Sequence, residues 1–227
     1  PSEGIRIDHI GLALEPALGE EAQATAAAAL VLDKFPGRKI AIVSDTAPAF
    51  ARLAATFKAA LAGKGVTPVA ELTFKAGVKD FTALAEKLKA AGAELIYLPA
   101  TYVEGGLIAQ AIRNAGSSAQ IVSGDSLVTD DFGNQAKDAA NGTLMTFTYD
   151  PRKFPAARPL VDRFRSAEQS AEGFTLYAYA AVQAWVAAAE ATSSTSSGRR
   201  ILWPRICTSR SSSTLSRPTW MRSARSG

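Results

Sequence analysis

The sequence predicts an α/β protein in which helices cover both faces of a parallel β-sheet. Its 227 residues are 47% hydrophobic and 20% charged, which is enough apolar material to bury a sizeable core. From residue 20 onward, short apolar runs alternate with helix-like segments of about 10–15 residues, the pattern of consecutive βαβ units. Glycines such as Gly37, Gly63 and Gly116 follow the helix-like segments and mark the turns between elements.

The expected elements can be placed in order from the spacing of their apolar residues. Phe50, Leu53, Phe57 and Leu61 recur at helical spacing, whereas 39–43 contains the continuous apolar run of a buried strand. Asp80 stands where a carboxylate can cap the first turn of a helix. The expected helices cover 20–35, 50–61, 80–91, 103–115 and a short stretch within 125–140, and the expected strands cover 39–43, 66–74, 94–99, 120–123 and 143–148.

The alternation of strands and helices ends at Tyr149–Asp150–Pro151. Two further helices are expected, at about 156–166 and 173–191, with no strand between them. The second is apolar on nearly every side, and such a helix needs cover on most of its faces. We therefore expect this segment to belong to a second lobe that is incomplete in this sequence.

The basic character of the sequence comes from its C-terminal tail. Seven arginines and no acidic residue follow Ser193, so removing them turns the net charge of +4 into −3 for residues 1–192. A nucleic-acid-binding function of the globular part is therefore not expected. The Ser/Arg-rich tail, 192–227, can be interpreted as disordered, as an RNA-binding segment or as a frameshift product. We favour the frameshift, because the Trp203–Pro204 codons read one nucleotide earlier give alanine and a string compatible with continued helix.

Several classes of site are excluded by residues that are rare or missing. His9 is the only histidine and Cys207 the only cysteine, so no histidine metal cluster, catalytic triad or disulfide is expected. No apolar run reaches the roughly 18 residues that span a bilayer. The sequence opens at Pro1 without a signal segment, so we expect a mature or truncated product.

Ligands of open parallel sheets bind at the carboxyl ends of the strands, so the strand-to-helix loops hold the candidate residues. The first such loop, 44–50, has no glycine, which argues against a dinucleotide or phosphate-binding loop. Asp45 stands alone, unlike the clustered acids of a phosphoacceptor domain. No nucleophile–base pair involving histidine is available, and catalysis is not expected, although Ser–Lys pairs remain open.

Two later loops carry polar groups with two possible roles. Tyr102 offers a ring and a hydroxyl, and the amides at Gly105 and Gly106 could approach an anion. The alternative is an ordinary helix start with Glu104 placed against the helix dipole. Asp125 and Ser126 could bind a ligand ammonium, or Asp125 could cap the following helix.

These loops resemble those of the periplasmic branched-chain amino-acid (leucine/isoleucine/valine) binding proteins, the type I substrate receptors of ABC importers. The matching stretches, each weak alone, keep their order and spacing across 37–190. They are Gly37–Asp45, Phe74–Phe81, Tyr102 ahead of the Gly105–Gly106 helix, Gly124–Ser126 and Tyr177–Ala184.

The resemblance implies a periplasmic-binding-protein type I fold, with a parallel Rossmann-like sheet flanked by helices and an incomplete second lobe. It divides the sequence into an uncertain N-terminal remnant (1–19), an α/β ligand-binding lobe (20–148), the hinge return and helices of the other lobe (149–191) and the tail (192–227). The family's first lobe should precede Glu20, and 1–19 does not match it clearly.

The resemblance also implies the ligand contacts. Tyr102 and Asp125 would meet the ligand's amino group, and Ser126 would lie beside them. Phe50 and its neighbour Ala47 would form the first-loop contact. The family often has Tyr-Gly where this sequence has Ala49–Phe50, which indicates a less polar or different ligand.

The function implied is capture of a small amino-acid-like or amide ligand for import, without catalysis and without a cofactor. The implied partners are ABC permease subunits, which would provide the only association with a membrane, and the implied location is periplasmic. No nucleic-acid partner is expected. The alternatives are a ligand-sensing regulatory lobe of the same fold and a small α/β metabolic enzyme.

Overall fold

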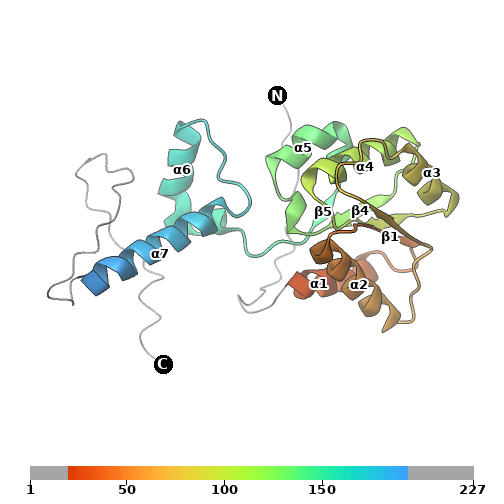
Figure 1. The fold of residues 1–227 in the computed structure, drawn as a ribbon, viewed down its shortest axis with the longest axis horizontal. Coiled ribbons are helices and arrows are strands. Elements are labelled where there is room, and N and C mark those ends of the chain that lie inside the picture. The colour runs from red at the N-terminus through yellow and green to blue at the C-terminus, as the bar shows by residue number, and fades with distance from the viewer. Residues whose placement is uncertain (1–19, 194–227) are drawn as a thin grey trace. The chain divides into compact units, whose positions relative to one another are not determined.

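A computed structural model describes residues 20–193 (Figure 1), and the expectations for residues 1–19 and for the tail beyond 193, including His9 and Cys207, lie outside the described residues. The chain forms two compact units that divide between Asp150 and Pro151. The first unit contains the sheet, and the second is helical.

A five-stranded parallel sheet forms the centre of the first unit. The strand order is β2-β1-β3-β4-β5, with every pair parallel. The chain places β2 on one side of β1 and the later strands on the other, so the strand order reverses between β1 and β3. The predicted parallel sheet is confirmed, although β2, β3 and β5 are shorter than expected. The strands are β1 (Ile40–Asp45), β2 (Ala70–Phe74), β3 (Leu95–Tyr97), β4 (Gln120–Ser123) and β5 (Leu144–Met145).

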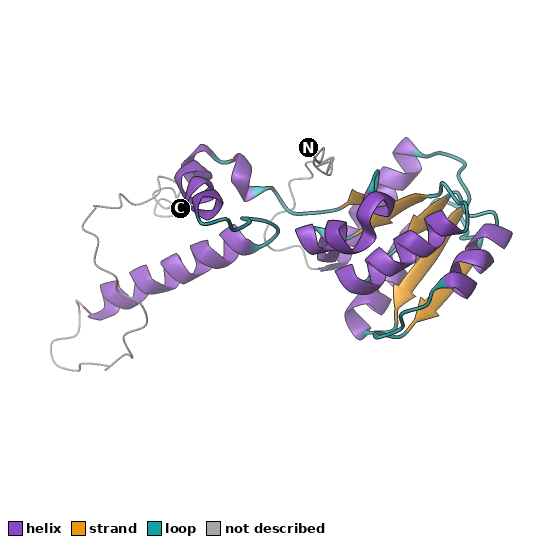
Figure 2. Cartoon of the chain, turned by 90° about the horizontal axis from the view of Figure 1, so that it is seen from above, coloured by secondary structure: helices purple, strands orange, loops and turns teal. Residues whose placement is uncertain are grey.

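Helices cover both faces of this sheet (Figure 2). Helices α1 (Glu20–Lys34) and α2 (Pro48–Ala62) pack on one face, where Ile40, Ile42, Leu95, Tyr97 and Val122 are buried. Helices α3 (Thr82–Ala90), α4 (Tyr102–Asn114) and α5 (Asp130–Ala136) cover the other face. Successive side chains of a strand point to opposite faces of the sheet, so one short strand contributes residues to both cores.

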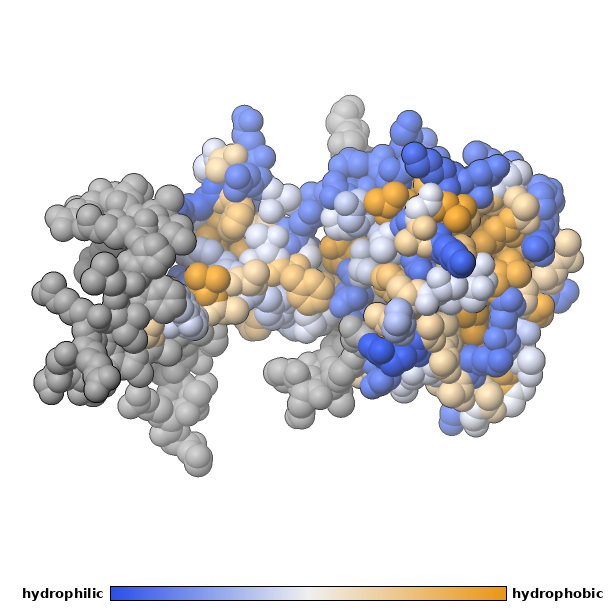
Figure 3. Space-filling view, viewed as in Figure 1, coloured by the Kyte–Doolittle hydropathy of each residue, from blue (hydrophilic) through white to orange (hydrophobic). Residues whose placement is uncertain are grey.

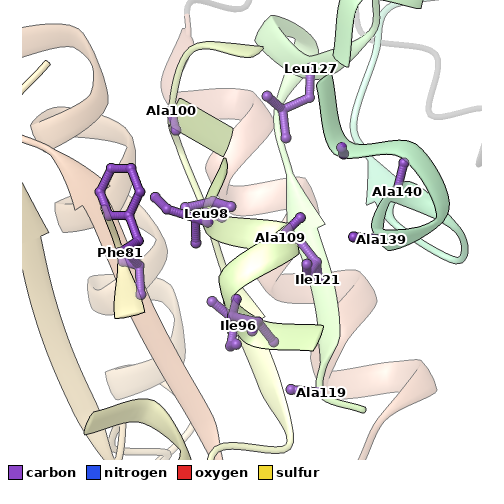
Figure 4. Close-up of a cluster of buried hydrophobic side chains, with 14 of the residues drawn as sticks. Phe81, Ile96, Leu98, Ala100, Ala109, Ala119, Ile121, Leu127, Ala139 and Ala140 are labelled. Atoms are coloured by element: carbon purple, nitrogen blue, oxygen red, sulfur yellow. The ribbon is translucent and has the colours of Figure 1, made fainter. Parts of the chain in front are cut away.

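The second face has the larger core. Figure 4 shows Ile96 of β3, Leu98 just after it and Ile121 of β4. Ala109 of α4 and Leu127, in the turn after β4, pack with them. All five are fully buried. Two short 3₁₀ helices, Asp125–Leu127 and Lys137–Ala140, complete this layer together with α5.

Helix α3 starts later than the sequence predicts. Asp80 was the expected cap, but Phe81 occupies the capping position and its side chain makes no capping hydrogen bond. The Asp80 carboxylate accepts instead from the N–H of Thr82 at 2.9 Å. This backbone hydrogen bond, with a second one from the Thr82 side chain, holds the pKa of Asp80 below its usual value. The carboxylate therefore still stabilises the start of the helix, although the capping position lies one residue later than Asp80.

The second unit contains the two helices expected after residue 150. They are α6 (Arg158–Ser166) and α7 (Thr175–Ser193), preceded by 3₁₀ turns at Pro151–Lys153 and Pro155–Ala157. Apolar residues reach the surface along α7 (Figure 3), among them Val182 and Trp185, which are 61% and 53% exposed. No helix within residues 20–193 is both long and apolar enough to cross a membrane.

Candidate functional site

The loops that follow β1, β3 and β4 meet at the carboxyl edge of the sheet. The strand order reverses between β1 and β3, and ligands of open α/β sheets bind at such a reversal. Two contacts join the loops there. The N–H of Asp45 donates to the carbonyl of Pro99 at 3.3 Å, and the Ser126 hydroxyl donates to the carbonyl of Ala100 at 2.7 Å. The segment 99–100 is therefore the point on which the other two loops converge.

The loop after β1 is shaped by its own aspartate. Asp45 is only 2% exposed, and its Oδ1 accepts from the N–H of Ala47 at 2.8 Å. The N–H of Thr46 donates to the carbonyl of Phe74 at the end of β2. Ala47 and Phe50 are half-buried, and Phe50 also packs against the core beneath α1 and α2. Ala47 occupies the N-terminal capping position of α2 and Phe50 lies in the first turn of that helix, so both apolar candidates sit at the boundary between core and surface.

The loop after β3 is anchored by the buried carboxylate of Glu104. This side chain is 7% exposed and accepts from the Gly77 N–H at 2.8 Å and from the Thr101 hydroxyl. Burial by itself raises the carboxyl pKa, but these hydrogen bonds outweigh it and the pKa lies below its usual value. Glu104 therefore ties the loop after β2 to the start of α4, where Tyr102 is 39% exposed.

Gly105 and Gly106 have a packing role. A Cβ at Gly105 would lie 2.8 Å from a methyl group of Leu127, and a Cβ at Gly106 would lie 2.5 Å from Cγ of Gln135. The Gly105 N–H is already bonded to the carbonyl of Thr101 at 2.8 Å. Close approach of α4 to its neighbours explains both glycines, and the anion-binding interpretation gains no support from this geometry.

Asp125, in the loop after β4, is held by a side chain 102 positions away. The Nε2 of Gln23, in α1, donates to Oδ2 of Asp125 at 2.7 Å, and the N–H of Asp125 donates to Oε1 of Gln23 at 3.1 Å. The capping position of the 3₁₀ helix that follows is Gly124, and Thr129 caps α5. The alternative in which Asp125 caps the next helix is therefore wrong.

Tyr97 is a buried polar residue that was not among the candidates, because it lies in β3 and the candidates were taken from the strand-to-helix loops. Its ring stacks on Phe57 with centroids 3.9 Å apart, and its hydroxyl has no hydrogen-bond partner among residues 20–193. Burial raises the pKa of this hydroxyl, and the negative charge of Asp125 raises it further. The Tyr97 hydroxyl and the Asp125 carboxylate therefore share one electrostatic environment.

Gln23 and Glu104 were also missed as site-supporting residues. Gln23 lies in an expected helix, and a single sequence gives no sign that it reaches residue 125. Glu104 entered only in one of two alternatives, as an acid placed against the helix dipole, and its contact with Gly77 depends on how the loop after β2 meets the start of α4. Only the spacing of Thr101 and Glu104 near a helix start resembles a known capping pattern.

Away from the carboxyl edge, the first unit has a surface hollow and no metal-binding cluster among its described residues. Within residues 20–193 there is no group of three or more side chains able to hold a metal ion. A surface hollow between α3 and α4, lined by Lys79, Phe81, Glu86 and Gln110 among others, contains none of the five candidate residues.

The chain matches the family model described as periplasmic binding protein over residues 17–201. It is 39% identical over 175 residues to Leu/Ile/Val-binding protein homolog 1 of Brucella melitensis, covering 77% of this chain and 47% of that protein. It is 36% identical to the Leu/Ile/Val-binding protein BraC3 of Rhizobium johnstonii, covering 72% and 45%. The chain thus spans about half the length of the curated relatives it matches.

Solved structures of similar fold include two that bear on the architecture. A leucine binding protein LivK from Thermotoga maritima superposes with a TM-score of 0.66 at 20% identity, over 72% of this chain and 48% of that one. LivJ of Streptococcus pneumoniae, solved with isoleucine, gives 0.65 at 23% identity, over 73% and 48%. At these identities the likeness concerns the fold, and it confirms the predicted architecture.

Proposed function

Because the chain belongs to the periplasmic binding protein family and has the type I fold of that family, we propose that it forms part of a solute receptor of an ABC importer. Its ligand would be a small amino acid or a related amide. The names of the relatives and the carboxyl-edge position of Asp125 support this proposal. The observation that carries it is the carboxylate of Asp125, held just after β4 at the carboxyl edge of the sheet by Gln23.

The chemistry of the edge suits a ligand with a cationic and an apolar end. A carboxylate offers about four lone-pair sites, so Asp125 can accept from an ammonium while it accepts from Gln23. Tyr102 presents an exposed ring, and Ser126 retains acceptor capacity after donating to Ala100. Ala47 and Phe50 add apolar surface, which favours an aliphatic side chain over a polar one.

The proposed role is capture without catalysis. Residues 20–193 contain no histidine and no cysteine, so the described part lacks the commonest general base and the strongest side-chain nucleophile. Capture in this family would be completed by a second lobe that closes over the ligand. Delivery to permease subunits and an extracytoplasmic location belong to the same proposal.

Calorimetric titration of the chain with L-leucine, L-isoleucine, L-valine and leucinamide tests this function. We expect saturable binding without turnover, and much weaker binding of 4-methylpentanoate, which is leucine without its amino group. Asp125→Asn should weaken leucine binding about ten- to hundredfold, the usual effect of losing a charged hydrogen-bond acceptor. The matched control Asp131→Asn changes an exposed acid in α5 and should leave affinity unchanged. Equal affinities for wild type and Asp125→Asn would overturn the proposal, as would product formation.

A further inference from the structure

Gln23 connects the first helix of the unit to the ends of two strands. It lies in the first turn of α1, yet its amide bonds both the backbone and the side chain of Asp125, just after β4. The hydroxyl of Thr146, just after β5, donates to the same Gln23 Oε1 at 3.5 Å. One side chain thus joins three segments that are distant in sequence.

The two bonds to Asp125 determine how the Gln23 amide is turned. The Asp125 N–H can only donate, so it must face Oε1, and this leaves Nε2 to face the carboxylate. The same residue is therefore held twice, once through its backbone and once through its side chain. A carboxylate fixed in this way has less conformational freedom to lose when a ligand binds.

Gly124 leaves room for this arrangement. A Cβ at position 124 would lie 3.0 Å from Oε1 of Gln23, tighter than ordinary van der Waals contact. The glycine before Asp125 and the glutamine that holds Asp125 therefore depend on each other.

We propose that Gln23 is a positioning residue that sets ligand specificity by holding the Asp125 carboxylate at the carboxyl edge of the sheet. The proposal rests on the proposed function for its ligand and on the Gln23–Asp125 contacts for its mechanism. The competing explanation is that Gln23 only attaches α1 to the sheet. That explanation predicts a change in stability but no change in the preference among ligands.

The first test needs no ligand. NMR would follow the titration of the Asp125 carboxyl group in the full chain, in Gln23→Glu and in Gln120→Glu. Gln23→Glu places a second carboxyl group against Asp125, so the two should titrate as a coupled pair with one apparent midpoint raised by about one pH unit or more. Within residues 20–193 the Gln120 side-chain amide donates to the carbonyls of Ile121 and Gly142 and does not contact Asp125, so Gln120→Glu should leave the Asp125 curve unchanged.

A second variant keeps the proposal testable if Gln23→Glu does not fold. In Gln23→Ala the Asp125 amide should exchange with solvent at least about tenfold faster than in the wild type, because its acceptor is gone. Neighbouring strand amides should keep their rates. An unchanged Asp125 titration curve in a folded Gln23→Glu variant would overturn the proposal, and so would an unchanged Asp125 exchange rate in Gln23→Ala.

Binding measurements with L-leucine and 4-methylpentanoate separate the role of Gln23 from the proposed function of the chain. Gln23→Ala should lower the preference for L-leucine over 4-methylpentanoate about tenfold or more, because a carboxylate free to rotate discriminates less between the two. Gln120→Ala should leave the preference unchanged. If the wild type binds neither compound, the proposed function fails and the specificity role fails with it, while the carboxyl titration still tests the Gln23–Asp125 contact on its own. If it binds leucine and Gln23→Ala keeps the full preference, the specificity role of Gln23 is wrong.

Discussion

The loops after β1 and β4 reach the same edge of the sheet but are held there by different means. Both loops make backbone bonds to neighbouring strand ends, but their side-chain supports differ. In the β1 loop the supporting side chain is local, because the Asp45 carboxylate accepts from the N–H of Ala47 two residues later. In the β4 loop the support comes from other elements, through Gln23 in α1 and the bond from Ser126 to Ala100. The side chain that holds Asp125 thus belongs to another element, whereas the side chain that holds Ala47 belongs to its own loop.

This difference has a physical reason. Apolar contacts are non-directional, so a helix start beside the core places Ala47 and Phe50 well enough. A charged contact depends on the direction of its lone pairs and needs its atoms within a few tenths of an ångström. Removing long-range supports should therefore disturb the β3 and β4 side more than removing local supports disturbs the β1 side.

The largest effect is expected when the close approach of α4 is obstructed. In Gly106→Ala the new Cβ would meet Cβ of Gln135 at 2.8 Å and the backbone N of Ala136 at 3.1 Å, neither of which can rotate away. Overpacking should outweigh the gain in helix propensity and cost about 2 kcal/mol of unfolding free energy in urea titration. Gly105→Ala is the matched control, because its Cβ meets only the flexible Leu127 side chain, and it should cost less than about 1 kcal/mol. Equal costs for the two variants would contradict this packing account.

A smaller loss is expected when the Glu104 anchor is removed. Glu104→Ala deletes the acceptor for the Gly77 N–H and the Thr101 hydroxyl. The free energy of unfolding should fall by about 1.5 kcal/mol, and not by more, because water can accept from the N–H of the exposed Gly77 in place of the carboxylate. Glu104→Gln keeps one acceptor oxygen and should fall between the alanine variant and the wild type.

The Glu104 effect should depend on pH in one direction. The folded-state pKa lies below the usual value of 4.5, so the stabilisation is complete above that value and is lost as the pH falls through the lower folded pKa. Urea titrations at pH 7 and at successively lower pH should show the gap between wild type and Glu104→Ala closing in acid. A gap that widens as the pH falls would contradict the assigned hydrogen bonds.

The smallest effect is expected on the β1 side. Asp45→Ala removes one local hydrogen bond and should cost about 1 kcal/mol, with faster hydrogen exchange at the Ala47 amide and unchanged exchange at Asp125. Asp45→Asn retains an acceptor oxygen and should stay close to the wild type. Faster exchange at Asp125 in Asp45→Ala would show that the two loops are not held independently.

Most of the fold could be predicted from the sequence because its signals are local. The run at 39–43 and the spacing of Phe50, Leu53, Phe57 and Leu61 report burial directly, and the structure has β1 and α2 at these places. Strand ends were less predictable. Pairing partners decide where a ladder stops, and β5 keeps only two of the six residues expected at 143–148.

The candidate site could be predicted only in part. Parallel strands bring their carboxyl ends to one edge, so Tyr102, Asp125 and Ser126 could be nominated from loop positions alone. Their supports could not. Gln23, Glu104 and Tyr97 act through contacts between elements, and those contacts depend on helix packing that no short motif encodes.

If the carboxyl edge of the sheet binds a small amino acid, titration of the chain with L-leucine should perturb the amide NMR signals of that edge. Saturable shifts are expected at 46–50, 101–102 and 124–126, which form that edge. Little change is expected at 36–39, 92–94 and 117–119, which precede the strands at the opposite edge. Shifts at the opposite edge, or none at millimolar leucine, would contradict binding at the carboxyl edge.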